Sequence, residues 1–295
     1  MLRFPTLLAR LTSWAGSSLA ALLSAGCSSL ESRFYQPQAI EYAVPPGVEE
    51  RMVTAEDGTR LQTWFLPSPS LRDGLVDRAP LVVICPGSRT QIDELTPLLR
   101  PIAMQADVSL LLLNYRGYGR SEAKTSVTRR TTLIDARAVL DHAFQRADVD
   151  PRRIALMGYS LGAVPALALA AQSTEVPAVV IGGVYGRASD VLADSGYGSL
   201  TWLIGSNHDP VDSASGMTGR PVFLFHGEED RDVPPYHALE LGAALLRSGA
   251  DLELHLVANR NHYDVLAPES SLNEDLIAFL RKTLHGKGEA SAPLK

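Results

Sequence analysis

The sequence predicts an α/β fold: a doubly wound, mostly parallel sheet with helices on both faces. Short apolar runs alternate with helical patterns along most of the chain, as expected for parallel strands joined by crossover helices. Runs such as 81–85 are apolar throughout, which is typical of strands with both faces covered. The 295 residues, 45% hydrophobic and 20% charged, suit one large globular domain.

The elements follow a regular order after an opening hairpin, which Asp57-Gly58 indicates between two strand-like segments. Strands are expected at 51–54, 61–66, 81–85, 108–114, 153–157, 177–184, 221–226 and 252–257. Helices are expected at 91–105, 131–147, 163–171, 236–246 and 273–284, and residues 67–79 are expected to form a polar loop.

This pattern also divides the chain into functional segments. The predicted segments are a signal peptide (1–27), a tether that becomes ordered toward the domain (28–50), the α/β domain (51–285) with a cap-like connection (186–219), and a flexible tail (286–295). The connection is too long for an ordinary loop, so a functional role is expected for it.

The N-terminal segment has a basic start followed by an apolar stretch over 11–25. Its end, Ser24-Ala25-Gly26-Cys27, resembles the lipobox of bacterial lipoproteins, although Ser24 replaces the usual leucine. The resemblance implies acylation of Cys27 and a lipid anchor in the bacterial cell envelope. Serines at 28 and 29, in place of an aspartate, favour the outer membrane facing the periplasm. The alternatives are a cleaved secretory signal, giving a soluble periplasmic or secreted protein, and a plain N-terminal helix.

Composition excludes several other classes. The net charge of −6 leaves no basic footprint, so no nucleic-acid partner is expected. The two cysteines and the histidine spacings match no metal site, and we predict neither metal nor cofactor. If Cys27 is acylated, Cys85 has no partner for a disulfide and must be buried to persist in an oxidising compartment. The sequence does not predict the oligomeric state.

A strand, a sharp turn and a helix meet at Gly158-Tyr159-Ser160-Leu161-Gly162. The G-x-S-x-G pattern in this context is typical of a nucleophile elbow, whereas the five residues alone also suit an ordinary glycine turn. Glycines on either side of Ser160 remove side chains that would collide with the neighbouring strand and helix. The helix N-terminus behind the serine favours developing negative charge. We therefore predict Ser160 as a nucleophile.

A serine nucleophile needs a base and an acid to orient that base, and in such folds the chain order is serine, acid, histidine. Asp230 is the candidate acid, because Gly227 opens the turn after the 221–226 strand and the third residue after it can point back across the sheet edge. Three neighbours compete on composition and are expected to form a solvated turn: Glu228, Glu229 and Asp232.

The candidate base is His262, in the loop after the last strand. Of the seven histidines, His208 in the long connection is the second choice, and His226 is expected to shape the turn before the acid. The oxyanion of acyl transfer needs two backbone N–H donors. The amide of Leu161 and that of Ser88, in the glycine-containing loop after the 81–85 strand, are the candidates.

Taken in order, these motifs resemble the α/β-hydrolase superfamily over about residues 50–285. The matching features are Gly87-Ser88, the segment 114–121, the elbow, and Gly227 to Asp230 with His262. The set is most similar to the small-cap branch that includes serine aminopeptidase-like and dienelactone hydrolase-like proteins. The resemblance implies the triad Ser160, Asp230 and His262. Pro86 in place of a frequent histidine, and Asn-Arg-Asn-His in place of Gly-x-Gly-His, depart from the family pattern and would reshape the pocket.

The predicted function is a serine hydrolase that cleaves a small-molecule acyl substrate: a carboxylic ester, thioester or lipid. Apolar residues of the 186–219 connection would line an acyl-sized pocket, or else pack as a helix and loop: Val191, Leu192, Tyr197, Leu200, Trp202, Leu203 and Ile204. A peptidase acting on short peptides remains an alternative within the same chemistry. A non-catalytic envelope protein that binds a partner or lipid is the alternative from another class.

Overall fold

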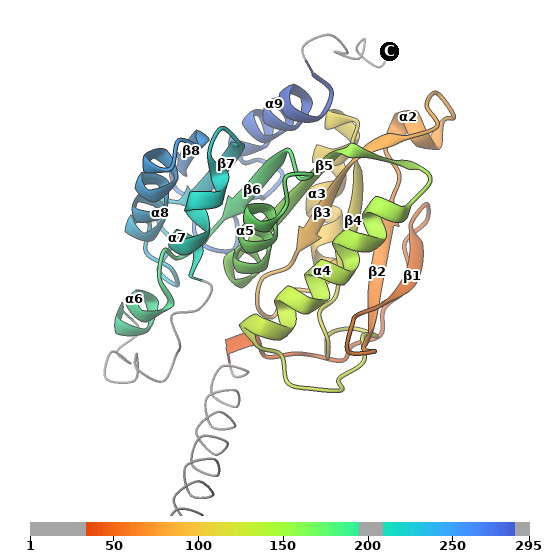
Figure 1. Cartoon of the computed structure of the whole chain (residues 1–295), viewed down its shortest axis with the longest axis horizontal. Helices are drawn as coiled ribbons and strands as arrows, with labels where there is room; N and C mark the ends of the chain where they lie inside the picture. Colours follow the sequence, from red (N-terminus) through yellow and green to blue (C-terminus); the bar gives the residue numbers. More distant parts are fainter. Residues whose placement is uncertain (1–33, 195–208, 287–295) are drawn as a thin grey trace, which may run out of the picture.

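The computed structural model describes residues 34–194 and 209–286, and these form one eight-stranded sheet covered by helices (Figure 1). The strand order is β1-β2-β4-β3-β5-β6-β7-β8. The strands are β1 Glu49–Thr54, β2 Arg60–Leu66, β3 Ala79–Cys85, β4 Ser109–Leu113, β5 Val149–Tyr159, β6 Ala178–Gly182, β7 Pro221–Gly227 and β8 Asp251–Val257. The α/β class predicted from the sequence is confirmed.

Strand direction explains where a site can form. β2 pairs antiparallel with β1 and with β4, and the hairpin turn at Gly58 lies where Asp57-Gly58 predicted it. From β4 to β8 all neighbours are parallel. The carboxyl ends of these strands therefore share one edge of the sheet, and the loops that follow them meet there.

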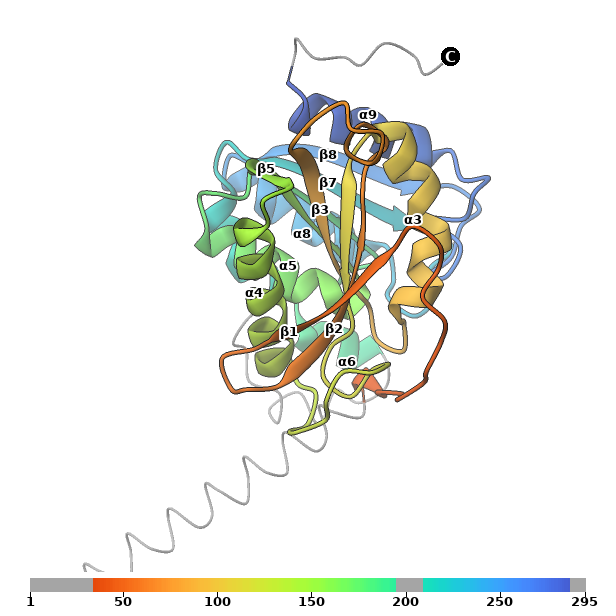
Figure 2. The ribbon, with the colours of Figure 1, turned by 90° about the vertical axis from the view of Figure 1, so that its right-hand side faces the viewer.

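The helices form two layers, one on each face of the sheet. Figure 2 shows α4 and α5 on one side and α3 on the other. The side chains of α4, α5 and α8 join one apolar core cluster, and those of α3 and α9 join a second. The helix bounds are α3 Ile92–Ala106, α4 Arg129–Gln145, α5 Ala163–Gln172, α8 Tyr236–Arg247 and α9 Leu272–Leu284.

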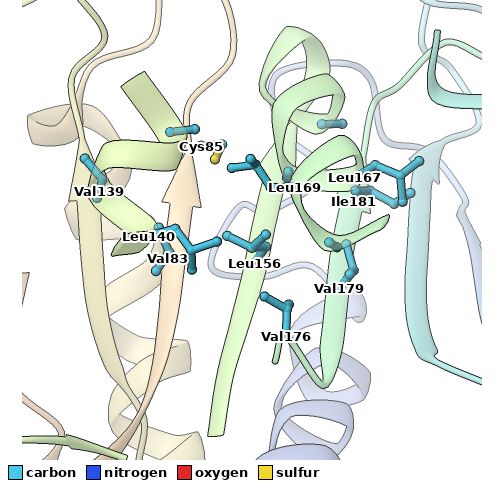
Figure 3. Packing of buried hydrophobic residues seen from close by; sticks show 14 of the residues in the cluster. Val83, Cys85, Val139, Leu140, Leu156, Leu167, Leu169, Val176, Val179 and Ile181 are labelled. Atoms are coloured by element: carbon cyan, nitrogen blue, oxygen red, sulfur yellow. The ribbon is translucent and has the colours of Figure 1, made fainter. Parts of the chain in front are cut away.

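Small and branched side chains fill the core between the sheet and α4 and α5 (Figure 3). Val83, Leu156 and Val179 come from three neighbouring strands and are fully buried. They belong to the same cluster as Leu140 of α4. Burial of each such side chain contributes about 1.5–3 kcal/mol of transfer free energy. Cys85 also lies in this cluster, where burial raises the pKa of its thiol to about 12, and it forms no disulfide within the described residues.

The structure differs from the sequence-based expectation in the loop before β3. The loop 67–79 contains a short helix, α2 Pro69–Arg72, because the Ser68 hydroxyl accepts a hydrogen bond from the Leu71 amide and Pro69 starts the helix. Within the tether expected at 28–50, Tyr35 already packs on the domain and is only 2% exposed. Of the connection 186–219, the structure describes α6 Ala188–Leu192, α7 Pro210–Ser213 and a 3-10 turn Ala214–Met217.

Three predicted features fall wholly or partly outside the described residues: the signal peptide 1–27 with Cys27, the middle of the cap-like connection, and the tail beyond residue 286. Across the ranges 34–194 and 209–286, no helix combines the length and apolar character needed to cross a membrane.

Candidate active site

The turn after β5 places Ser160 in a strained conformation at the carboxyl edge of the sheet. Its φ is 52°, in the left-handed region that non-glycine residues rarely adopt. A Cβ on Gly158 would lie 2.4 Å from the Gly162 oxygen, and a Cβ on Gly162 would lie 2.1 Å from the Cys85 oxygen. Both positions therefore require glycine, and the tight turn projects the serine above the strand.

The structure brings Ser160, His262 and Asp230 together from loops after three different strands. His262 Nε2 is 3.2 Å from Ser160 Oγ, and His262 Nδ1 is 2.7 Å from Asp230 Oδ2. An ionised carboxylate only accepts hydrogen bonds, so Nδ1 carries the imidazole proton and Nε2 is left to accept from the serine hydroxyl. The hydroxyl, the imidazole and the carboxylate thus form one hydrogen-bonded chain.

Asp230 is buried and tightly held. Its Oδ1 accepts from the amides of Val233 at 2.8 Å and Asp232 at 3.0 Å. Burial acts to raise the pKa of this carboxyl, but hydrogen bonds from His226, His262 and the Val233 amide outweigh it and hold the pKa below the usual aspartate range. The competing carboxylates of Glu228, Glu229 and Asp232 are exposed, as the sequence predicted for them.

A second imidazole, that of His226, reaches the same carboxylate. His226 is fully buried at the end of β7, with Nε2 2.7 Å from the Val233 oxygen and 3.1 Å from Asp230 Oδ2. Both neighbours accept hydrogen bonds, so Nε2 carries the proton. The sequence predicted only that His226 shapes this turn. Its contact with the acid depends on how the turn folds back four residues later, which spacing alone does not determine.

Tyr159, the variable residue of the G-x-S-x-G pattern, supports the base. Its hydroxyl donates to the His262 backbone oxygen at 2.5 Å, and its ring centroid lies 5.2 Å from that of the imidazole. The ring also stacks on Phe225 of β7, at 5.8 Å between centroids. Tyr159 therefore ties the loop after β8 to the elbow, a role that the sequence analysis missed.

Close backbone contact also joins the loops after β7 and β8. A Cβ on Gly227 would lie 2.3 Å from the Arg260 oxygen, so only glycine fits there. The Glu229 amide donates to the same oxygen at 2.9 Å. This contact fixes the loop that carries Asp230 against the loop that carries His262.

The loop of Ser88 lies directly against the elbow. A Cβ on Gly87 would lie 3.2 Å from the Tyr159 oxygen and 3.3 Å from Ser160 Cβ. Arg89 has a φ of 62°, a second left-handed non-glycine residue at the same edge. Ser88 and Leu161 are the predicted amide donors. Ser88 thus lies in the loop beside Ser160, and Leu161 directly follows Ser160 in the chain. His208, the second choice for the base, is outside the described residues.

No group of three or more metal-ligating side chains occurs in the part of the chain that the structure describes. A cavity of about 640 Å³ lies away from the triad, between β1 and α4. It contains none of the residues that surround Ser160.

Comparison with known proteins agrees with this geometry. A family model described as the prolyl oligopeptidase family matches residues 102–287, more than half of the chain. The chain belongs to the prolyl oligopeptidase family. Membership of this family identifies the protein as an enzyme, a hydrolase, and confirms the predicted α/β-hydrolase superfamily. The finer placement in a small-cap branch stays a prediction.

Several individual proteins are similar to this member of the prolyl oligopeptidase family over most of its length. An uncharacterized protein of Mycobacterium tuberculosis, Rv2307c, is 32% identical over 209 residues, covering 68% of this chain and 69% of that protein. The uncharacterized protein YfhR of Escherichia coli O157:H7 is 26% identical over 262 residues, covering 85% and 87%. The Pyrococcus furiosus esterase Pf2001 shares the fold with a TM-score of 0.69 at 16% identity, over 85% of this chain and 98% of that chain.

Proposed function

We propose that the protein hydrolyses ester-type substrates through an acyl-enzyme on Ser160, with His262 as base and Asp230 as the acid that orients it. The observation that carries this proposal is the continuous chain of hydrogen bonds from Ser160 Oγ through the imidazole to Asp230, at 3.2 and 2.7 Å. A carboxylic ester, a thioester or a lipid presents the acyl carbonyl that such a serine attacks.

In the first half of the reaction, Ser160 Oγ attacks the acyl carbon while its proton moves to His262 Nε2. The imidazolium that forms is stabilised by Asp230, which remains ionised because its pKa is lowered. The amides of Ser88 and Leu161 are proposed to donate to the negatively charged oxygen of the tetrahedral intermediate. Return of the proton from Nε2 to the leaving alcohol or thiol completes acyl transfer to the serine.

In the second half, a water molecule takes the place of the leaving group. His262 accepts a proton from the water as the water attacks the acyl carbon, and the same oxyanion donors act again. Breakdown of this intermediate releases the carboxylic acid and returns the proton to Ser160 Oγ. Overall, one ester and one water molecule give one carboxylic acid and one alcohol.

A peptidase is the second candidate, and the family match is the observation that favours it. Both reactions use the same groups and differ in the leaving group. We favour the ester because the fold is shared with an esterase that lacks a large additional domain, and because the sequence of the 186–219 connection is rich in apolar residues suited to an acyl chain.

We also propose that the chain is anchored through a lipid on Cys27, in a bacterial envelope. The sequence ending in Cys27 supports this proposal, and the position of Tyr35 gives it a consequence. Tyr35 is buried beside the Ser88 loop, and the eight residue-to-residue steps from Cys27 to Tyr35 span at most about 29 Å. An acyl anchor would therefore keep Tyr35, and with it this side of the domain, within about that distance of the membrane surface.

Fluorophosphonate labelling of the full chain tests the proposed activity, and membrane partitioning of the same samples tests the anchor. Labelling should be lost in Ser160→Ala and strongly reduced in His262→Ala, and esters of graded chain length compared with short peptide amides then define the substrate. If folded wild-type protein does not label, the non-catalytic binding protein becomes the better account. In the same samples, labelled wild-type protein should partition with membranes and Cys27→Ser should not. Equal partitioning of the two proteins would contradict the proposed lipid anchor.

A further inference from the structure

The first residues that the structure describes are packed against the loops of the active site. Figure 1 shows the start of the described chain beside the N-terminal end of α4, at the same end of the molecule as α6. We call residues 35–38 the strap. Tyr35 is 2% exposed and belongs to the core cluster that also contains Tyr118.

The strap bridges two loops that follow neighbouring strands. The Tyr35 backbone oxygen accepts from the Arg89 amide at 3.2 Å, in the loop after β3, and from the Tyr118 hydroxyl, in the loop after β4. The Gln38 backbone oxygen accepts from the Gly119 amide at 2.9 Å. The strap thus joins two segments that no strand pairing connects at this edge.

The contact with Arg89 falls where the active-site loop is strained. A left-handed conformation costs a non-glycine residue roughly 1–2 kcal/mol, and Arg89 adopts one with a φ of 62°. Such a conformation persists only where surrounding contacts hold it. On one side of Ser88, Gly87 lies against the elbow; on the other, the Arg89 amide is held by Tyr35. The peptide of Ser88 is fixed between these two contacts.

We propose that Tyr35 is a positioning residue of the active site, which acts through its backbone oxygen to hold the Ser88 amide toward the oxyanion. This inference rests on the proposed function and adds to it a segment that lies before the first strand. The ring of Tyr35 anchors the strap in the core, and the backbone oxygen orients the loop. Loss of the ring releases the strap, and the loop then relaxes from its left-handed conformation.

Full-length Tyr35→Ala and Tyr35→Phe, assayed on p-nitrophenyl butyrate, test this role. Tyr35→Ala should lower kcat by about tenfold to a hundredfold with little change in KM, because a displaced oxyanion donor weakens binding of the transition state and not of the substrate. Affinity for phenylboronic acid, which forms a tetrahedral anion on the serine, should fall in parallel. Tyr35→Phe keeps the ring and the backbone oxygen and should recover most of the rate.

Leu140→Ala is the matched control, because Leu140 is buried in the same core cluster but lies on α4 and not in a loop of the active site. It should lower the melting temperature and leave kcat unchanged. If Tyr35→Ala does not fold, Tyr118→Phe decides: it removes the hydroxyl that donates to the Tyr35 oxygen and that also lies against the Arg89 amide, and it should lower kcat by a few-fold. Folded variants with wild-type kcat would overturn the proposed role of Tyr35. A wild-type protein without esterase activity or labelling would instead overturn the proposed function itself.

Discussion

Two buried carboxylates, Asp230 and Asp135, sit in different regions of the molecule and are held by different partners. The side chains of both are fully buried. Asp135 of α4 pairs with the guanidinium of Arg116 at 2.6 Å and accepts from the Arg116 amide at 2.9 Å. Asp230 faces two imidazoles, those of His262 at 2.7 Å and His226 at 3.1 Å.

The difference lies in whether the partner can exchange a proton. A guanidinium keeps its charge at any ordinary pH, so Arg116 does not exchange a proton with Asp135. Arg116 also pairs with Asp57 at 2.7 Å, which ties the hairpin turn, the loop after β4 and α4 together. An imidazole beside Asp230 can gain a proton and lose it again. In this protein, burial alone therefore does not distinguish the carboxylate of the candidate site, whereas the kind of partner does.

The largest effect expected from this comparison is on catalysis by Asp230→Asn. The amide group would present a donor to His262 Nδ1 and favour the tautomer that cannot accept the Ser160 proton. Loss of the orienting acid in such a triad lowers kcat by about 10⁴-fold. Steady-state kinetics on a short-chain ester, together with circular dichroism to establish folding, measures this change. Asp135→Asn is the matched control, and its folded fraction should keep kcat within a few-fold of wild type.

Asp135→Asn should instead lower stability. The substitution leaves a buried guanidinium without its closest counter-charge, and breaking a buried ion pair on one side costs about 3–5 kcal/mol. Urea denaturation gives the free energy of unfolding. Asp57→Asn removes the other, partly exposed partner of Arg116 and should cost about 1 kcal/mol or less. If the two substitutions destabilise equally, the buried pair is not the main link.

The sequence predicted the sheet and helices well because their signals are local. The run 81–85 is apolar throughout and became the fully buried strand β3, and Asp57-Gly58 became a hairpin turn. The short helix α2 was missed because a proline- and serine-rich segment also suits a loop, and its start depends on one hydroxyl of Ser68.

The residues of the site divide in the same way. Ser160, Asp230 and His262 could be chosen because each follows a strand in the expected chain order, and the structure brings those three together. The supporting contacts could not be predicted from the sequence. Tyr159 reaches a backbone oxygen 103 residues away, and the Tyr35 oxygen meets a hydroxyl 83 residues away. Such contacts depend on the packing of distant loops and leave no periodic pattern in the chain.

The last expected effect concerns acid stability. Because the native pKa of Asp230 is lowered, the unfolded chain binds the proton more readily, so the stabilisation by this carboxylate is present above about pH 4 and is lost as the pH falls toward the native pKa. The free energy of unfolding of wild type should therefore approach that of Asp230→Asn between pH 5 and about pH 2.5, by about 1–2 kcal/mol.

Urea denaturation at a series of pH values measures this convergence. Asp57 titrates in the same window: hydrogen bonds with Thr59 and Arg116 outweigh its slight burial and lower its pKa to about 2. Its contribution is common to both proteins and cancels in the difference. A difference between wild type and variant that stays constant down to pH 2.5 would show that the two imidazoles do not stabilise the ionised carboxylate.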